Sequence, residues 1–275
     1  MSQAAGFTRK QVQTGSFQLS WLEAGDAPET LVLLHGIGSN AQSWARQLAY
    51  FSGHYRVVAW DAPGYGNSAG LATEDTSPNA YAQALKALFA ALAVQRAVLV
   101  GHSLGAIIAA RFAWLWPEAV EALVLSAPAS GYGWHPGDVL PAGLQQRLDD
   151  IMRLGPEGMA KARAARTLTP VANAEIIAKA QEAMASVSVK GYQDAVHLLA
   201  QGTLKADLLK LDIDFSVLCG MEDQTTPLSK VDPDTQLTRR RELVLLKGAA
   251  HASYLEYPDL YNQELASLLE KSKNF

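Results

Sequence analysis

Short apolar runs alternate with longer helical segments along most of this chain. Several of the short runs are apolar throughout rather than at every second position. Continuous runs of this kind are typical of strands that are covered on both faces. The pattern predicts strands at residues 16–23, 30–34, 56–60, 97–100, 122–125, 215–219 and 243–246.

Helical segments separate these strands. The chain predicts helices at residues 43–52, 78–93, 104–116 and 259–271. Regular alternation of strand and helix is typical of a mostly parallel sheet, because parallel neighbours need a crossover that a helix supplies. Such crossovers are right-handed and place helices on the faces of the sheet. The sequence therefore predicts an α/β fold.

The alternation stops between residues 130 and 209. Glycines and prolines are followed there by stretches rich in Ala, Leu, Met and Gln, which predict helices near residues 142–154, 156–166, 172–186 and 191–201. An insertion at the carboxyl end of a strand lies where ligands bind in open α/β sheets. We interpret residues 130–209 as a helical cap, and residues 1–129 and 210–275 as the core domain. The alternative is a helical subdomain that packs elsewhere.

Composition restricts the class of protein. A chain of 275 residues that is 49% hydrophobic can bury a large core in one domain that carries a smaller inserted one. The net charge is −4 and the longest basic run is Arg239-Arg240-Arg241, so we expect neither nucleic acid nor a membrane surface as partner. The sequence does not indicate an oligomeric state.

Two further features bear on the compartment. Cys219 is the single cysteine, which excludes an intrachain disulfide and fits a reducing environment. Residues 1–13 hold no apolar leader segment, and no apolar run reaches the roughly 18 residues that a membrane span needs. We therefore expect a cytoplasmic location.

The segment Gly101-His102-Ser103-Leu104-Gly105 joins a predicted strand directly to a helix. Such a tight turn strains its central residue and requires neighbours with almost no side chain. Ser103 would then stand at the strand end, where the helix directs its first amides, chiefly that of Leu104, at a developing negative charge. The pattern favours a nucleophilic serine. The alternative is a glycine-rich turn whose serine only caps a helix.

A nucleophilic serine needs an imidazole base, and the base needs an acid that holds its tautomer. Asp223 and His251 each follow a later predicted strand, so both are expected near Ser103. Glu222 is the alternative acid, but the spacing of the loop favours Asp223. The other histidines lie beside glycines, in a loop or in the insertion, and are less suited to the role: His35, His54, His102, His135 and His197.

The loop after the strand at residues 30–34 supplies a second amide. In His35-Gly36-Ile37-Gly38 the glycines permit close approach, and the N–H of Ile37 is the expected second donor to a substrate oxyanion. The turn at residues 61–68, Asp-Ala-Pro-Gly-Tyr-Gly-Asn-Ser, is expected to brace this loop and the helix after it.

Together these motifs resemble the α/β-hydrolase superfamily, in the branch that carries a helical cap after the sixth strand. The matching segments are residues 35–38, 61–68, 101–105 and 220–227, with His251. The resemblance implies a mostly parallel eight-stranded sheet flanked by helices, with an inserted cap. It also implies a catalytic triad of Ser103, Asp223 and His251, and an oxyanion hole made by the amides of Ile37 and Leu104.

The expected activity is hydrolysis of small, largely apolar carboxylic esters or related acyl compounds through an acyl-enzyme. Several apolar side chains of the insertion are candidates to line the substrate pocket: Leu140, Leu144, Leu148, Met152, Met159, Val196 and Leu199. Ser103 argues against the related dehalogenases, which use an aspartate. His102 and Ala106 depart from the pattern of hydrolases that cleave the C–C bond of ring-fission dienones. C–C hydrolysis, enol-lactone hydrolysis and a non-turnover ligand sensor are the alternatives.

We expect neither a cofactor nor a metal. The glycine-rich turns at residues 36–38 and 64–66 lack a third glycine at the offset of a dinucleotide-binding loop. No group of His, Cys and Asp has metal-ligand spacing. Hydrolysis by a serine, a histidine and an aspartate needs neither group.

Overall fold

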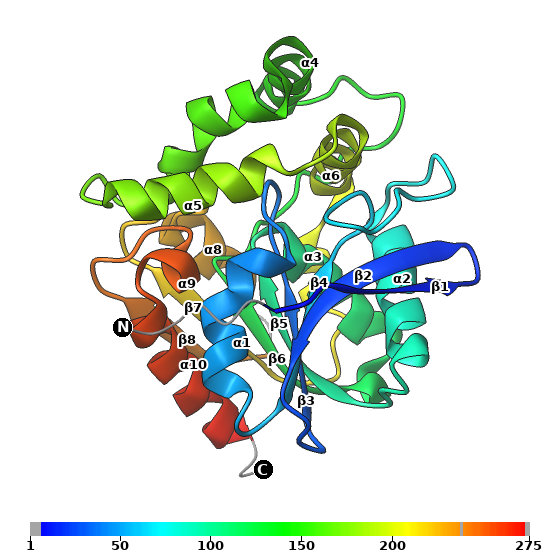
Figure 1. Cartoon of the computed structure of the whole chain (residues 1–275), viewed down its shortest axis with the longest axis vertical. Helices are drawn as coiled ribbons and strands as arrows, with labels where there is room; N and C mark the ends of the chain where they lie inside the picture. Colours follow the sequence, from blue (N-terminus) through cyan, green and yellow to red (C-terminus); the bar gives the residue numbers. More distant parts are fainter. Residues whose placement is uncertain (1–6, 237–238, 273–275) are drawn as a thin grey trace.

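A computed structural model describes residues 7–236 and 239–272, in which eight strands form one sheet (Figure 1). The strand order is β1-β2-β4-β3-β5-β6-β7-β8. The pairs β1–β2 and β2–β4 are antiparallel, and every other neighbouring pair is parallel. The expected mostly parallel, eight-stranded α/β sheet is confirmed. The strands are β1 Lys10–Thr14, β2 Phe17–Ala24, β3 Thr30–Leu34, β4 Arg56–Asp61, β5 Ala97–His102, β6 Val120–Ser126, β7 Phe215–Gly220 and β8 Arg240–Leu246.

The central strands are the ones that the apolar pattern predicts best. Every residue of β3 and of β5 is buried, as a strand covered on both faces requires. The first strand was not predicted, because its sequence KQVQT is mostly polar and exposed. It lies at the edge of the sheet and pairs only with β2. An edge strand needs little apolar surface, so the apolar pattern does not reveal it.

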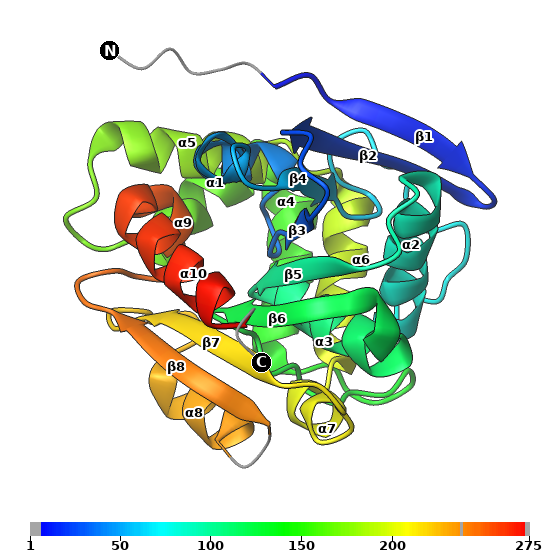
Figure 2. The same ribbon diagram turned by 90° about the horizontal axis from the view of Figure 1, so that it is seen from below.

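Helices cover both faces of the sheet (Figure 2). One face carries α1 (Ala45–Phe51) and α10 (Pro258–Ser272), which pack against each other; the other carries α2 (Pro78–Ala91) and α3 (Leu104–Leu115). The serine before α2 fixes where this helix begins. The side chain of Ser77 accepts a hydrogen bond from the backbone amide of Ala80 and so caps the helix. The shorter elements are η1 Ala41–Trp44, η2 Pro117–Ala119, η3 Ala164–Thr167, α8 Leu228–Thr235 and α9 Ser253–Glu256.

Four α-helices lie between β6 and β7: α4 Ala142–Arg163, α5 Ala174–Ala185, α6 Val189–Gln201 and α7 Leu204–Leu208. In Figure 1, α4, α5 and α6 form a layer above the sheet. The short α7 packs instead against α3. Arg111 of α3 donates there to both carboxylate oxygens of Asp207, at 3.0 and 2.8 Å. No helix within the described residues is both long and apolar enough to cross a membrane.

The long α4 is broken at Gly155. This residue has φ 65° and ψ 177°, outside helical geometry, and Pro156 follows it. A positive φ favours glycine, and proline cannot continue the hydrogen bonds of a preceding turn. Two helical segments therefore meet at an angle where the sequence predicts two separate helices. The break allows residues far apart along α4 to approach each other.

Candidate active site

Ser103 occupies the strained turn between β5 and α3, with φ 53° and ψ −113°. The neighbouring glycines make this turn possible. A Cβ atom on Gly101 would lie 2.5 Å from the carbonyl oxygen of Gly105, and one on Gly105 would lie 2.4 Å from that of Leu34. Real Cβ atoms do not approach other atoms so closely. The surrounding backbone thus holds Ser103 in a conformation that a non-glycine residue rarely adopts.

His251 and Asp223 meet beside this turn. Nδ1 of His251 lies 2.8 Å from Oδ2 of Asp223, and both side chains are buried. His251 and Ser103 line the same cavity. The alternative acid, Glu222, is exposed at the edge of that cavity. The fold therefore brings the three residues of the expected triad to one end of the sheet, and it pairs the histidine with Asp223.

Asp223 is held as a carboxylate by its surroundings. Burial by itself raises the pKa of this group, but the hydrogen bond and charge of His251 and the hydrogen bonds of Thr226 outweigh it and lower the pKa to about 2. The amides of Thr225 and Thr226 donate to Oδ1 at 2.7 and 2.9 Å, and the hydroxyl of Thr226 lies 2.8 Å from Oδ2. The sequence did not single out Thr226; the signal was a polar run directly after an aspartate at a strand end.

His102 lies behind His251. Its Nε2 is 2.9 Å from the carbonyl oxygen of His251, so this nitrogen carries the proton, because a carbonyl only accepts. Burial and the neighbouring His251 lower the pKa of His102 to about 3. The ring therefore stays neutral and packs 4.7 Å from that of His251 and 4.8 Å from that of Tyr254, measured between ring centroids. His102 fixes the loop that carries His251.

Two backbone segments adjoin Ser103: the loop that carries Ile37, where a Cβ on Gly36 would lie 2.9 Å from the Cβ of Ser103, and the start of α3 at Leu104. Ile37 lines the cavity, and Leu104 is the first residue of α3. Across residues 7–236 and 239–272, neither amide donates a hydrogen bond to another group of the chain. The first amides of a helix have no partner within the helix and attract negative charge. Both N–H groups are therefore free to bind a substrate oxygen.

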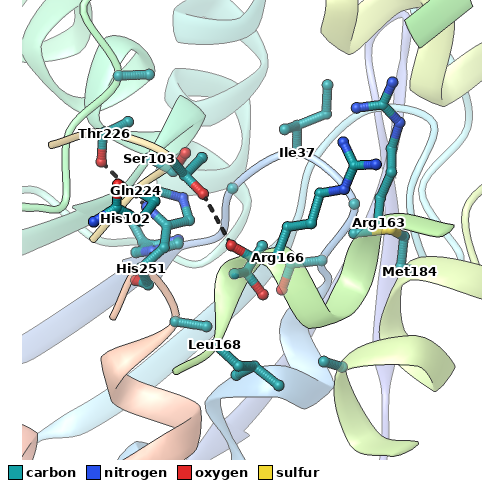
Figure 3. Close-up of a pocket in the computed structure, with 18 of the residues that line it drawn as sticks. Ile37, His102, Ser103, Arg163, Arg166, Leu168, Met184, Gln224, Thr226 and His251 are labelled. Carbon is teal, nitrogen blue, oxygen red and sulfur yellow. Dashed lines mark hydrogen bonds between the residues drawn. The ribbon is translucent and has the colours of Figure 1, made fainter. Parts of the chain in front are cut away.

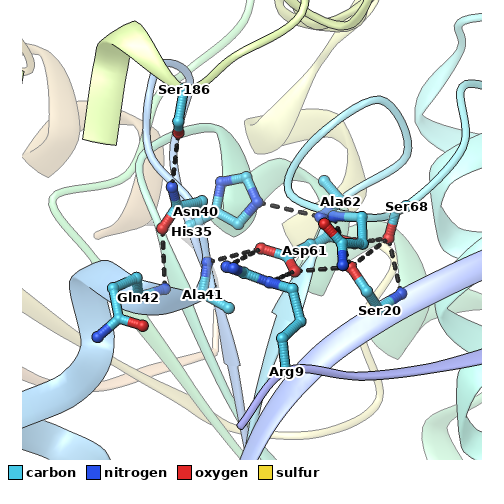
Figure 4. A network of polar contacts seen from close by, with 11 residues as sticks. Arg9, Ser20, His35, Asn40, Ala41, Gln42, Asp61, Ala62, Ser68 and Ser186 are labelled. Atoms are coloured by element: carbon cyan, nitrogen blue, oxygen red, sulfur yellow. Dashed lines mark hydrogen bonds and ion pairs between the residues drawn. The ribbon is translucent and has the colours of Figure 1, made fainter. Parts of the chain in front are cut away.

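A buried polar network holds the loop of Ile37 in place (Figure 4). Nδ1 of His35 donates to the carbonyl of the next residue at 2.9 Å, and its Nε2 accepts from the amide of Ala62 at 3.0 Å. Burial lowers the pKa of His35, so the ring stays neutral and can do both. Oδ1 of Asp61 accepts from the amide of Ala41 at 3.0 Å, and Arg9 neutralises Asp61 at 2.6 Å. These contacts fit the bracing role expected of residues 61–68.

Elements of the sheet and of the insertion together enclose a cavity of about 780 Å³ (Figure 3). Of the apolar insertion residues considered from the sequence, only Leu199 lies at its wall. Leu144, Met159 and Val196 are buried within the protein, and Met152 is exposed. Other apolar wall residues are Ile37, Leu168, Met184 and Leu255.

The wall also contains cationic side chains that the sequence had not assigned to the site. They are Arg147, Arg163, Arg166 and Lys230. In the sequence they look like the solvated face of a helix, and no motif marks them. The expectation of a largely apolar pocket is therefore revised to a mixed one.

Within the described residues, no group of three His, Cys, Asp or Glu side chains could hold a metal ion. The residues around Ser103 also include no glycine-rich cradle with dinucleotide spacing. That the reaction needs neither a metal nor a cofactor stays a prediction.

Comparisons with known proteins identify the family of this chain and its relatives. The Alpha/beta hydrolase family profile matches residues 31–264. A pimeloyl-[acyl-carrier protein] methyl ester esterase of Klebsiella pneumoniae is 30% identical over 258 residues, which cover 90% of this chain and 96% of the relative.

Solved structures agree in fold. An esterase from Thermogutta terrifontis superposes with a TM-score of 0.84 at 22% identity, covering 96% of this chain and 99% of the other. The enol-lactonase from Burkholderia xenovorans LB400 gives 0.82 at 19% identity, covering 95% and 100%. Sheet, turn and family profile lead to one conclusion: this chain is an enzyme of the alpha/beta hydrolase family.

Proposed function

We propose that the protein hydrolyses carboxylic esters, with Ser103 as nucleophile, His251 as base and Asp223 as the acid that orients the base. The observation that carries the proposal is the shared cavity of Ser103 and His251, in which the histidine is bonded through Nδ1 to a buried carboxylate. This bond leaves Nε2 as the nitrogen that exchanges protons with the serine and the substrate.

The proposed reaction has two halves. Oγ of Ser103 attacks the ester carbonyl while His251 takes the hydroxyl proton, and the resulting oxyanion accepts hydrogen bonds from the amides of Ile37 and Leu104. Collapse of this intermediate expels the alcohol, which receives its proton from His251. Water then gives a proton to His251 and attacks the acyl-serine, and the carboxylic acid leaves as the serine regains its proton.

We further propose that residues 130–209 act as a cap over this site. The contacts between the insertion and the loop of Ile37 support this role. The side-chain amide of Asn40 donates to the hydroxyl of Ser186 at 2.8 Å, and the side chain of Met184 lies against Gly38. The cap would shield the reacting carbonyl from bulk water and determine which esters enter.

The comparison with the Klebsiella esterase supports ester hydrolysis in particular, because that relative is named for a methyl ester. Methanol, the alcohol of that ester, is the smallest that an ester can release, and His251 would supply the proton with which it leaves. We therefore propose short-alcohol esters of small acyl groups as the substrate class.

The test is steady-state hydrolysis of p-nitrophenyl and methyl esters of increasing acyl length. The wild type is compared with Ser103→Ala and with Ser130→Ala, whose serine also lines the cavity but lies outside the strained turn. We expect turnover by the wild type and by Ser130→Ala, and a loss of at least about 1,000-fold in Ser103→Ala.

A second measurement removes the dependence on substrate choice. A serine-directed phosphonate should add to the wild type at Ser103, which peptide mass analysis would locate. If Ser103→Ala retains a tenth of the wild-type rate, the proposed nucleophile is wrong. If the phosphonate labels Ser103 and no ester of any length is turned over, ester hydrolysis is wrong and C–C bond or lactone substrates become the better explanation.

A further inference from the structure

The charge of the cavity contrasts with that of the whole chain. The chain carries a net charge of −4, but the charged side chains at the cavity wall are three arginines, one lysine and the single carboxylate of Glu222. In the view of Figure 3, Arg163 and Arg166 lie on the side of Ile37, across from His251. A positive cavity on an acidic protein calls for a reason beyond solubility.

The break in α4 assembles this group of charges. Arg163 and Asp150 lie on opposite sides of Gly155, and in a straight helix their 13-residue separation would place them about 20 Å apart. Instead, Nη2 of Arg163 lies 2.6 Å from Oδ2 of Asp150. Arg147 is on the first helical segment and also reaches the cavity. The fold thus uses the break to direct side chains of both segments into one space.

Asp150 neutralises only part of this charge. Arg163 donates to Asp150 through both Nε and Nη2, and Arg153, which is exposed, also contacts it at 3.2 Å. Asp150 therefore supplies one negative charge to two guanidinium groups. These contacts hold the side chain of Arg163 in place, since it is 15% exposed.

Two other guanidinium groups have no anionic partner among residues 7–236 and 239–272. Nη1 of Arg147 donates to the neutral hydroxyl of Tyr192 at 3.1 Å, and no carboxylate of the described part of the chain pairs with it. The side chain of Arg166 has no hydrogen bond or ion pair within the described residues, although its backbone carbonyl is 3.4 Å from the hydroxyl of Thr225. Both line the cavity that holds Ser103. Each therefore brings a guanidinium group with donors to spare to the wall of the cavity that a substrate would enter.

We propose that the substrate carries a carboxylate in addition to the ester, and that Arg166 and Arg147 bind it while Ser103 attacks the ester carbonyl. The proposal rests on the ester hydrolysis proposed above and specifies its substrate class: half-esters of dicarboxylic acids, or esters of hydroxy acids. A guanidinium presents paired N–H donors that match a carboxylate and keeps its charge at every pH at which proteins are stable.

The carboxylate could belong to the acyl part or to the alcohol part of the ester. Two series of compounds distinguish these sources. The first consists of monomethyl esters of linear dicarboxylic acids, each paired with the methyl alkanoate of equal chain length. The second consists of acetyl esters of ω-hydroxy acids, each paired with the acetyl ester of the corresponding alcohol. Within each pair the ester is the same and only the distant charge differs.

For the wild type we expect kcat/KM for the carboxylate member to exceed that for its neutral partner by about ten- to a hundredfold in one of the two series, which is what one or two charge-assisted hydrogen bonds contribute. In Arg166→Gln and Arg147→Gln this ratio should fall at least about tenfold. Arg166→Lys should retain part of it, because it keeps the charge but loses the paired donors.

Arg153→Gln is the matched control. It removes an arginine of α4, as Arg147→Gln does, but Arg153 contacts Asp150 and does not line the cavity. The ratio should stay at the wild-type value in this variant. Added salt provides a second readout: raising NaCl should increase KM for the carboxylate member but not for its neutral partner, because ions screen the attraction.

The outcomes separate this inference from the proposed function. If neutral esters are hydrolysed in a Ser103-dependent reaction and no carboxylate member is preferred in either series, the carboxylate site is wrong and ester hydrolysis stands. If no ester is hydrolysed and a phosphonate does not label Ser103, the proposed ester hydrolysis itself is wrong, and the carboxylate site that rests on it is wrong as well. A preference that persists in both arginine variants would also overturn the assignment.

Discussion

Asp223 carries the charge on which the proposed base depends. Its carboxylate accepts from two backbone amides, from the Thr226 hydroxyl and from His251, so an amide side chain would keep the shape but lose the charge. We expect Asp223→Asn to lower kcat at pH 7 by about 1,000- to 10,000-fold with little change in folding, because the imidazolium loses its counter-charge and the tautomer reverses. Ester hydrolysis and the urea midpoint measure the two effects.

Glu222→Gln is the control for that substitution, since Glu222 is the exposed neighbour. Its kcat on a neutral ester should stay within about threefold of the wild type. An equal loss of kcat in Asp223→Asn and Glu222→Gln would show that the loop tolerates neither substitution. It would contradict the assignment of Asp223 as the acid of the triad.

The pH dependence of activity follows from the same residues. The pKa of Asp223 is lowered to about 2 and that of His102 to about 3, so above pH 4 the first is charged and the second neutral. The proposed base is a histidine, which must be neutral to accept the serine proton. We expect log kcat/KM to fall with a slope of one as the pH is lowered from 8 to 5. A flat profile, or a slope of two, would contradict a single histidine base.

At the scale of elements, the turn between β5 and α3 depends on backbone proximity. A Cβ on Gly105 would lie 2.4 Å from the carbonyl oxygen of Leu34, a backbone atom that cannot rotate away. We expect Gly105→Ala to separate α3 from β3, to lower the free energy of unfolding by about 3 kcal/mol and to abolish ester hydrolysis. Urea denaturation and steady-state kinetics test this.

Gly143→Ala is the matched control for the glycine change. Gly143 lies in α4, and no atom stands within 4 Å of the position its Cβ would take. This substitution should stabilise the protein by up to about 1 kcal/mol, because alanine loses less backbone entropy in a helix. A Gly105→Ala variant as stable as this control would refute the steric account of the turn.

At the scale of the whole molecule, the buried pair of Arg111 and Asp207 joins the end of the insertion to the sheet layer. The carboxylate of Asp207 is 1% exposed, and burial raises its pKa even though Arg111 opposes the shift. We expect Arg111→Met to lower the free energy of unfolding by about 3 kcal/mol near pH 8, because it leaves a buried charge without a partner. Arg46→Met, which removes an exposed pair with Asp259, should change it by less than about 0.5 kcal/mol.

The loss of stability in Arg111→Met depends on pH through the carboxyl group of Asp207. A carboxyl with a raised pKa in the folded state binds more protons folded than unfolded, so its contribution to stability falls as pH rises. The destabilisation by Arg111→Met should therefore be smaller at pH 5 than at pH 8, as Asp207 takes up a proton. Urea unfolding at both pH values measures it, and an equal loss at the two values would argue against a buried charge.

The sequence by itself determined the features that depend on local pattern. Continuous apolar runs mark the buried strands such as β3 and β5, and the Gly-Pro step in α4 marks its break. The spacing of Gly101, Ser103 and Gly105 indicates the strained turn, because its steric requirement lies within five residues. The exposed edge strand β1 could not be predicted from its apolar pattern, because its pairing with β2 rather than its own residues makes it a strand.

Only the tertiary structure determines which side chains surround Ser103. Thr226, His102 and the arginines of the cavity come together from segments whose local sequences look like ordinary loops or solvated helix faces. Their positions depend on how the insertion packs over the sheet and on the direction α4 takes after Gly155. Strand and turn formation is governed by neighbours along the chain, whereas the charge of a cavity is governed by neighbours in space.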